Sequence, residues 1–174
     1  MRLVLALAFV VACHKKAPEP STSLFDALSD PTLSAADQAA RDAARQEDVS
    51  RLVENFKRVY FATDSAILDS SSRTALTENA AILSKWPEIK VEVQGHADER
   101  GTTEYNLALG QRRAGAVTSW LAGNGVGGSR LAAVSYGEEM PLTPGSGETS
   151  WSQNRRAEFR ITWGASGTLA GTAY

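Results

Sequence analysis

The chain has 174 residues, of which 43% are hydrophobic and 22% are charged, and these fractions are typical of one packed domain plus accessory segments. The formal net charge of −2 provides no basic field, which argues against nucleic acid as a partner. The single cysteine, Cys13, excludes an internal disulfide and a cysteine metal cluster.

The N-terminal residues form a short apolar run. Arg2 is followed by ten consecutive apolar residues, whereas a membrane-spanning helix needs about 20. Residues 1–12 are therefore predicted to be a cleaved signal peptide, with a buried N-terminal helix as the alternative. Residues 10–13, Val-Val-Ala-Cys, resemble the bacterial lipobox, which implies that Cys13 carries lipid chains such as palmitate. His14 stands where an aspartate would resemble an inner-membrane retention signal, which implies the outer membrane.

Two segments of different composition follow the lipobox-like sequence. Residues 13–33 contain three prolines and several serines and threonines, which predicts a flexible tether. Residues 34–56 are rich in alanine, and Ser34 is a suitable N-cap, so a helix is predicted there. Its first half is polar nearly all round, which predicts a solvated spacer helix. Leu52 and Phe56 belong to an apolar stripe near its end, which we expect to pack against the domain that follows.

Residues 57–164 alternate between strand and helix patterns and are predicted to form the globular domain. Strands are predicted at residues 58–62, 89–94, 131–136 and 156–163. Helices are predicted at residues 70–86 and 103–121, with one helical turn at 148–154. This order indicates an α/β fold, an α+β two-layer sandwich in which about four strands form a mixed sheet with the helices packed on one face. Residues 165–174 are small and polar and are predicted to be a flexible tail.

A strand, a polar loop and a helix succeed one another at residues 91–113, and we expect the binding site there. Asp98 lies in the loop that leads into the helix N-terminus, where unpaired backbone N–H groups and the helix dipole favour anions. At 100° per residue, Arg113 falls at the edge where the helix meets the sheet, and Arg112 falls on the solvated side.

This pair of opposite charges suits a zwitterionic ligand. Arg113 would bind a carboxylate in the fork of its guanidinium, and Asp98 would accept hydrogen bonds from an ammonium group. The alternative is structural: a salt bridge between Arg113 and Asp98, or an Asp98 side chain that caps its own loop.

The segment G-H-A-D-E-R-G-T-T-E-Y-N-L-A-L-G-Q-R-R-A, residues 95–114, resembles the OmpA-like peptidoglycan-binding domain. More narrowly, it resembles the peptidoglycan-associated lipoproteins (Pal) of the Tol-Pal system. V-Y-F-A-T-D-S at residues 59–65, V-S-Y-G-E-E-M-P at 134–141 and N-R-R at 154–156 belong to the same resemblance, which covers about residues 59–159. It implies a βαβαβ(α)β fold.

The resemblance also implies a ligand, the meso-diaminopimelate side chain of the stem peptide, which ends in an amino-acid zwitterion. The residues implied as its contacts are Asp98, Arg113, Phe61, Ala62, Asp64, Asn106 and Leu109. Asp98 and Arg113 are the main ones. Relatives often carry an acidic residue at the position of Ala62, so a carboxylate contact is lost there, whereas a main-chain contact would survive. Variants lacking Asp98 or Arg113 are expected to fold but not to bind the cell wall.

The function implied is that of an outer-membrane lipoprotein on the periplasmic face, bound non-covalently to peptidoglycan and tethering the outer membrane to the cell wall. It would be the Pal component of the Tol-Pal system in envelope integrity and cell division, with TolB-like and other Tol proteins as partners. Two alternatives remain open. One is an envelope adaptor whose main ligand is a periplasmic protein. The other is a peptidoglycan-cleaving enzyme with Asp98, Glu99 and Glu104 as acid/base carboxylates.

No catalytic residue, cofactor or metal is expected, so the chain is predicted not to be an enzyme. His96 is the residue that would suggest a metal, but the only other histidine is His14 in the tether. We therefore expect His96 to be a loop residue hydrogen-bonded to its neighbours. Arg155 and Arg156 are expected to be solvated or salt-bridged.

Overall fold

The computed structural model describes residues 34–163 and 169–172, and the signal peptide, Cys13 and tether predicted for residues 1–33 lie outside the described residues. The chain divides into two compact units, Met1–Arg41 and Asp42–Tyr174, and the second contains the sheet. Among the described helices, none combines the length and the apolar composition needed to cross a membrane.

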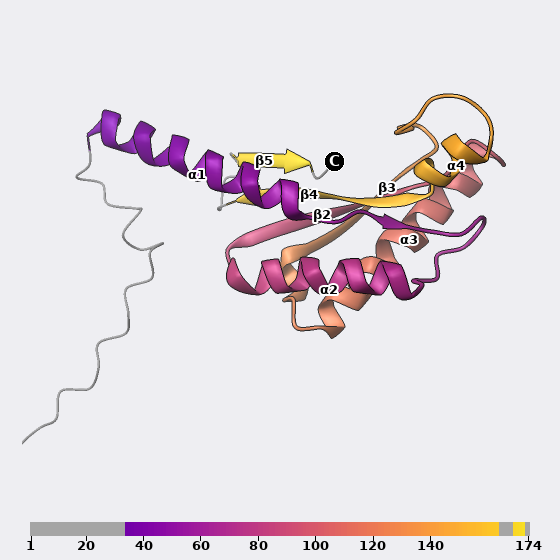
Figure 1. Cartoon of the computed structure of the whole chain (residues 1–174), viewed down its shortest axis with the longest axis horizontal. Coiled ribbons are helices and arrows are strands. Elements are labelled where there is room, and N and C mark those ends of the chain that lie inside the picture. Colours follow the sequence, from indigo (N-terminus) through magenta and orange to yellow (C-terminus); the bar gives the residue numbers. More distant parts are fainter. Residues whose placement is uncertain (1–33, 164–168, 173–174) are drawn as a thin grey trace, which may run out of the picture. The chain divides into compact units, whose positions relative to one another are not determined.

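A mixed sheet forms the centre of the second unit (Figure 1). Its main strands are β1 (Val59–Tyr60), β2 (Ile89–His96), β3 (Leu131–Gly137) and β4 (Arg156–Trp163), in the order β1-β4-β2-β3. Strand β2 is parallel to β3 and antiparallel to β4, and β4 is antiparallel to β1. The predicted mixed sheet with four strands is confirmed, although β1 is shorter than the five residues expected.

A further strand, β5 (Leu169–Thr172), pairs antiparallel with the second half of β4. The prediction of a flexible tail is wrong for these four residues. Because β1 pairs only with Arg156 and Ala157 at the start of β4, the rest of that edge would leave backbone N–H and C=O groups unpaired. Strand β5 pairs with this free part of the edge, from Arg160 to Trp163.

Two helices, α2 (Ser70–Lys85) and α3 (Thr103–Gly123), pack on one face of the sheet (Figure 1). Their N-termini are capped by Asp69 and Thr102, whose side chains accept from the backbone N–H of the third residue of each helix. A third helix, α4 (Glu148–Asn154), directly precedes β4. The predicted helices are thus confirmed to within two residues at each end.

Helix α1 (Ala35–Asn55) begins after Ser34, whose hydroxyl accepts from the Asp37 backbone N–H at 3.2 Å. Leu52 and Phe56, near its C-terminal end, are buried, and the Phe56 ring centre lies 5.7 Å from that of Phe159 on β4. The helix and its buried end agree with the prediction for residues 34–56, while the role of a spacer stays a prediction.

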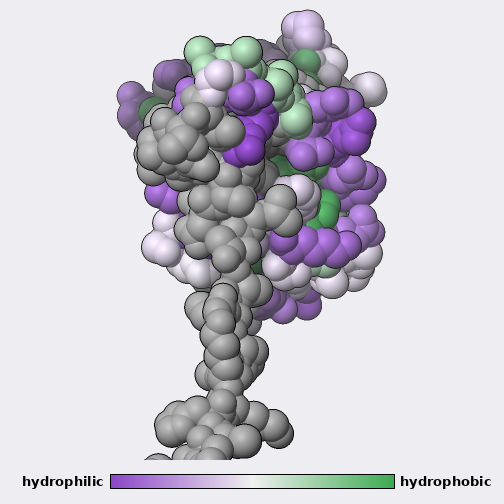
Figure 2. All heavy atoms as spheres, turned by 90° about the vertical axis from the view of Figure 1, so that its left-hand side faces the viewer, coloured by the Kyte–Doolittle hydropathy of each residue, from purple (hydrophilic) through white to green (hydrophobic). Residues whose placement is uncertain are grey.

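The core lies between the sheet and the helices. It is built from fully buried side chains of α2, α3, β2 and β4, including Leu76, Leu83, Val117, Leu121, Val93, Phe159 and Ile161. On the face shown in Figure 2, hydrophilic residues occupy most of the described surface and hydrophobic residues form only small areas. Burial of the apolar side chains therefore accounts for the packing of α2 and α3 on the sheet.

Helix α3 approaches β2 closely at two glycines. A Cβ atom on Gly95 would clash with the carbonyl oxygen of Gly110, and a Cβ on Gly110 would lie 2.7 Å from the carbonyl oxygen of Gly95 and closer still to the Ser135 hydroxyl. Only glycine, which has no side chain, fits at these two positions. The contact sets the first turns of α3 against the end of β2.

Candidate functional site

The loop between β2 and α3 borders a hollow of about 240 Å³. The hollow is lined by two residues of the loop after β1, three of the loop after β2 and three from the first turns of α3: Thr63, Asp64, Asp98, Arg100, Gly101, Tyr105, Asn106 and Leu109. Segments almost 40 residues apart in sequence therefore meet at the N-terminus of α3.

Asp98 is the buried carboxylate of this hollow, with 7% of its surface exposed. Its Oδ1 accepts from the backbone N–H of Arg100 at 3.2 Å and from Arg100 Nε at 3.0 Å. Its Oδ2 accepts from Arg100 Nη2 at 2.7 Å and from Arg155 Nη1 at 3.4 Å. Burial acts to raise the pKa of Asp98, but the Arg100 hydrogen bonds outweigh it and hold this pKa below its usual value. Asp98 is therefore ionised at neutral pH.

Arg113 is fully buried behind the hollow. Its Nε donates to the carbonyl oxygen of Ser65 at 2.9 Å, its Nη1 to that of His96 at 2.7 Å and its Nη2 to that of Ala62 at 3.2 Å. The guanidinium also lies 5.2 Å from the centre of the Phe61 ring. Burial lowers the pKa of Arg113 to about 10, so the side chain stays charged at neutral pH. Arg113 thus fastens the loop after β1 to the end of β2.

Four of the seven predicted contact residues line the hollow, namely Asp64, Asp98, Asn106 and Leu109. Phe61 is buried, and Ala62 is exposed with its carbonyl bonded to Arg113. Arg113 bonds to the end of β2, at the junction of helix and sheet where its position on the helix placed it, but it does not line the hollow, because the surrounding carbonyl groups enclose its guanidinium.

Asp98 and Arg113 do not form the salt bridge considered as a structural alternative. The ion pairs of Asp98 are with Arg100 and Arg155. The second structural alternative, an Asp98 side chain that caps its own loop, is confirmed in part, because Asp98 accepts from a backbone N–H of that loop. Arg112 is exposed, as predicted, and its guanidinium lies 5.6 Å from the ring centre of Tyr105.

Two arginines that bond to Asp98, Arg100 and Arg155, were not predicted from the sequence to belong to the site. Arg100 lies 4.2 Å from the Trp151 ring and bonds to Asp98, and the Asp-x-Arg spacing within one loop was a signal that could have indicated this bond. Arg155 donates to the Phe61 carbonyl at 3.1 Å and pairs with Glu148 at 2.6 Å. Arg155 is 57 residues from Asp98, so no local sequence pattern indicated their hydrogen bond. Arg155 was expected to be either solvated or salt-bridged. It is salt-bridged, and its side chain is buried.

The opposite wall of the hollow is held by Asp64 and Tyr105. Asp64 has a φ of +55°, a left-handed conformation that aspartate tolerates better than most residues. Its carboxylate accepts a hydrogen bond from the Tyr105 hydroxyl of α3. This hydrogen bond raises the pKa of Tyr105, so the hydroxyl stays a donor at neutral pH. The bond orients the Asp64 carboxylate beside the first turn of α3.

His96 differs from its prediction. It is the last residue of β2 and not a loop residue, and its ring is 2% exposed and stacks on Tyr136 with ring centres 5.6 Å apart. Neither ring nitrogen has a hydrogen-bond partner among the described residues, so the expected bonds to its neighbours are absent. The ring lines a pocket on the sheet face opposite α3, while its carbonyl bonds to Arg113. Within residues 34–163 and 169–172, no cluster of three or more histidine, cysteine, aspartate or glutamate side chains is arranged to hold a metal ion.

The mixed sheet, the two helices on one face and the charged hollow at the start of α3 define a binding domain of the OmpA type. Residues 60–155 match the model of the OmpA family. The chain belongs to this family, and the resemblance stated from the sequence is confirmed.

Three relatives with similar sequences carry one name. The chain is 39% identical over 160 residues to the peptidoglycan-associated lipoprotein of Pseudomonas aeruginosa, which covers 91% of this chain and 93% of that one. It is 42% identical over 137 residues to the protein of the same name from Haemophilus influenzae, covering 79% and 90%. It is 46% identical over 100 residues to that of Brucella melitensis, and spans only 60% of that relative's length.

Solved structures agree with this assignment. The structure of the peptidoglycan-associated lipoprotein from Burkholderia pseudomallei has a TM-score of 0.59 and 44% identity, and covers 61% of this chain and 90% of that one. The C-terminal domain of MotB from Helicobacter pylori has a TM-score of 0.58 at 23% identity, covering 64% and 88%, which shows the shared fold alone.

Proposed function

We propose that the chain is an outer-membrane lipoprotein that binds peptidoglycan non-covalently through the hollow at the start of α3. The ligand is the diaminopimelate side chain of the stem peptide, and binding tethers the outer membrane to the cell wall. Within the envelope the chain acts as the Pal component of a Tol-Pal system, with TolB-like and other Tol proteins as partners. The names of the relatives support wall binding and a lipid anchor.

One observation carries the proposal: a buried, ionised Asp98 in a hollow at a helix N-terminus, with the buried cation Arg113 behind it. The free end of diaminopimelate carries an ammonium and a carboxylate on one carbon. The ammonium would bond to Asp98 and take over part of the charge neutralisation that Arg100 provides without ligand. The carboxylate would lie near the first N–H groups of α3 and the main chain of Ala62.

Arg113 has a double role in this proposal. Of the five N–H groups of a guanidinium, three are used by the carbonyl oxygens of Ala62, Ser65 and His96. These bonds position the walls of the hollow. Because the side chain is fully buried, the second contribution of Arg113 is its positive charge, which favours an anion in the adjacent hollow.

The N-terminal assignments complete the proposal. A signal peptide over residues 1–12, a lipidated Cys13 with a tether to residue 33, and a spacer helix over 34–56 would connect the outer membrane to the binding domain of residues 57–164. Acylation can be tested directly by mass spectrometry of the N-terminal peptide from detergent-extracted protein. The expected product begins at Cys13 and carries lipid chains, and an unmodified N-terminus would contradict the anchor.

Co-sedimentation with isolated sacculi tests wall binding. The purified full-length protein is expected to pellet with sacculi, and Asp98→Asn to remain in the supernatant, since loss of one charge-assisted hydrogen bond weakens binding by about 10- to 150-fold. Glu104→Gln is the matched control, because Glu104 is an exposed carboxylate in the first turn of α3 that does not line the hollow. A folded Asp98→Asn variant that pellets like the unsubstituted protein would contradict the assignment.

The peptidoglycan-cleaving alternative has less support. A general acid needs a raised pKa, whereas hydrogen bonds from Arg100 hold the pKa of Asp98 below its usual value despite burial, and those from Ser146 and Trp151 lower that of Glu99. Both carboxylates are thus favoured in the ionised form. Incubation with sacculi is expected to release no muropeptides, and their release would favour the enzyme.

The alternative function, an envelope adaptor whose main ligand is a protein, predicts that partner binding does not depend on Asp98. If the main ligand is a periplasmic protein, a pull-down of a TolB-like partner should be as strong with an Asp98→Asn variant that no longer binds sacculi. Adding stem-peptide fragments to the unsubstituted protein shows whether the two ligands compete.

A further inference from the structure

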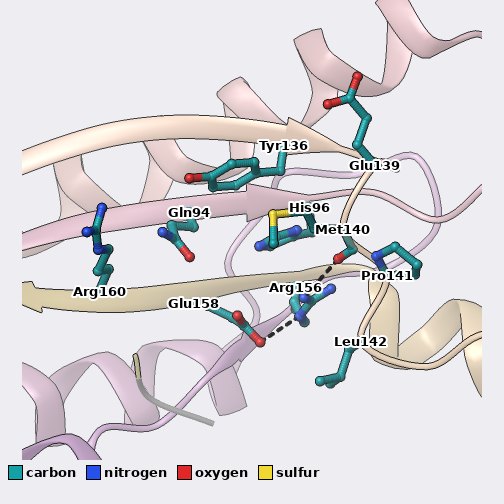
Figure 3. Close-up of a pocket in the computed structure, with 10 residues that line it drawn as sticks. All are labelled: Gln94, His96, Tyr136, Glu139, Met140, Pro141, Leu142, Arg156, Glu158 and Arg160. Atoms are coloured by element: carbon teal, nitrogen blue, oxygen red, sulfur yellow. Dashed lines mark hydrogen bonds and ion pairs between the residues drawn. The ribbon is translucent and has the colours of Figure 1, made fainter. Parts of the chain in front are cut away.

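A second and larger pocket, of about 490 Å³, lies on the sheet face opposite α2 and α3. Its lining includes Gln94 and His96 of β2, Tyr136 of β3, Met140 of the following loop, and Arg156 and Glu158 of β4 (Figure 3). Figure 3 shows these side chains projecting from three neighbouring strands and one loop into a common space. The hollow around Asp98 shares none of its lining residues.

Three of the four charged side chains that line this pocket form ion pairs. Glu158 bonds to Arg156 Nε at 2.8 Å and lies 3.0 Å from Arg58 Nε. Arg160 lies 3.9 Å from Glu92, and Arg156 also donates to the Met140 carbonyl at 3.2 Å. With two arginines and two glutamates in the lining, the formal charge is balanced. The pocket therefore offers neither a strong anion site nor a strong cation site.

His96 is the polar side chain of this pocket whose bonding capacity is unused. His96 is 2% exposed, and among the described residues neither of its ring nitrogens has a hydrogen-bond partner. Burial and the positive charge of Arg156 together lower the pKa of His96 to about 4, so the ring is neutral at neutral pH. An unpaired buried nitrogen costs free energy unless a ligand or water bonds to it.

The neutral state of the His96 ring limits the kinds of ligand that can form a hydrogen bond with it. A neutral imidazole has one N–H donor and one acceptor nitrogen, and which of them faces the pocket depends on the tautomer. A hydroxyl group both donates and accepts, so it can bond to either tautomer, whereas a carboxylate or an ammonium can bond to only one. The balanced charges of the lining also favour an uncharged molecule.

The walls suit a ring-shaped ligand with both polar and apolar surface. Tyr136 stacks on His96 with an interplanar angle of 15°, and Met140 is 54% exposed at the rim. These side chains provide flat apolar surface next to the polar groups of Gln94, Arg156 and Glu158, the combination found in small-molecule sites. A sugar ring presents apolar C–H faces and a rim of hydroxyl groups.

We propose that this pocket is a second binding site that takes an uncharged saccharide, with a sugar hydroxyl bonded to the His96 ring. The inference deepens the proposed function, and rests on it, in taking the glycan strand of the wall as the natural source of the sugar. Because Arg113 holds the His96 carbonyl on the other side of β2, one strand end would contact the glycan on one face and position the stem-peptide site on the other.

The test titrates the full-length protein with two probes that each carry one half of the polymer. The first is a trisaccharide of β-1,4-linked N-acetylglucosamine without peptide, and the second is a diaminopimelate-containing tripeptide without sugar. The readout is the ¹⁵N resonance of the His96 ring, which is distinguishable because the chain has only two histidines. The trisaccharide is expected to shift this resonance saturably, and the tripeptide is expected to bind to the protein without shifting it.

Variants locate the sugar. His96→Phe keeps a flat ring but removes both nitrogens, and is expected to weaken trisaccharide binding roughly 10-fold, the effect of one hydrogen bond between neutral groups. Tyr136→Leu removes the stacked ring at the same pocket and provides the test if His96→Phe fails to fold. Arg112→Ala, on the exposed side of α3, is the control that should bind the sugar unchanged.

Each outcome is decisive. No saturable shift of the His96 ring up to the solubility limit of the trisaccharide, or equal binding by folded His96→Phe and Tyr136→Leu, overturns the saccharide site. Binding of an unrelated peptide in this pocket without sugar binding overturns it too, in favour of a protein ligand. Sugar binding without tripeptide binding leaves the saccharide site standing and refutes the stem-peptide proposal.

Discussion

His96 ends β2 and Asp98 follows two residues later in the loop, and both side chains are buried, yet they differ in their hydrogen bonding. Both carboxylate oxygens of Asp98 accept hydrogen bonds from arginines, whereas neither ring nitrogen of His96 has a partner among the described residues. The two side chains serve opposite faces of the sheet, the first beside α3 and the second in the pocket on the other face.

The difference shows how similar burial can favour different charge states. Burial of a carboxylate costs less when guanidinium groups bond to it, so Asp98 remains an anion. Burial of His96 next to Arg156 favours the neutral imidazole. One face therefore holds charges ready for a charged ligand, and the other holds a neutral donor and acceptor.

The largest expected effect on stability comes from Arg113. Replacing it with alanine removes the cation that bonds to three carbonyl groups, and should destabilise the fold by about 3 kcal/mol or more. Urea denaturation measures this loss. The structure thus revises the expectation that a variant without Arg113 simply folds and fails to bind.

The neighbouring Arg112→Ala is the matched control, because Arg112 is exposed. It should change the free energy of unfolding by less than about 0.5 kcal/mol. Equal stability of the two variants would show that the hydrogen bonds of Arg113 to the three carbonyl groups do not stabilise the fold.

The pH dependence of stability tests the other face. The pKa of His96 is about 4 in the folded protein, below its usual value of 6.5, so the unfolded chain binds more protons between these values. The free energy of unfolding should therefore fall as the pH drops from about 6.5 to about 4, by an amount on the order of 3 kcal/mol. The charged groups that act on the ring are Arg156, Glu158 and Arg58.

The variant His96→Phe should lose this part of the pH dependence, as measured by urea denaturation at several pH values. Because Asp98 also has a lowered pKa, its contribution to stability disappears only below its usual pKa of 3.8, in a separate range. An identical pH profile for the variant and the unsubstituted protein would show that His96 titrates normally.

A smaller effect is expected where α3 meets β2. Gly110→Ala would bring a Cβ atom against the Gly95 carbonyl and the Ser135 hydroxyl, and should destabilise the fold by about 1–3 kcal/mol. Gly115→Ala is the control, since a Cβ there meets nothing within 4 Å, and should be neutral or stabilising by up to about 1 kcal/mol. If the two variants are equally stable by thermal denaturation, the close approach does not position α3.

Local patterns predicted much of the fold. The strand patterns of residues 89–94 and 156–163 and the helix patterns that begin at residues 70 and 103 depend on neighbours in sequence. The corresponding elements are present. Strand β5 could not be predicted, because its four residues have no strand pattern and pair with β4 only where β1 ends.

The site was predictable in part for the same reason. Asp98 and Asn106 lie in one continuous motif, and both line the hollow. The helical wheel gave the side of α3 on which Arg113 lies, but its full burial depends on carbonyl groups of two distant segments. The bond from Arg155 to Asp98 joins residues 57 apart, so no local pattern could reveal it.

The most direct test of the central claim is made on the ligand. Calorimetric titration compares a stem tripeptide that ends in diaminopimelate with the same tripeptide ending in lysine, which keeps an ammonium group but lacks the side-chain carboxylate. If the hollow recognises a zwitterion, the lysine peptide should bind about 10- to 150-fold more weakly. Equal affinity for the two peptides would contradict the account.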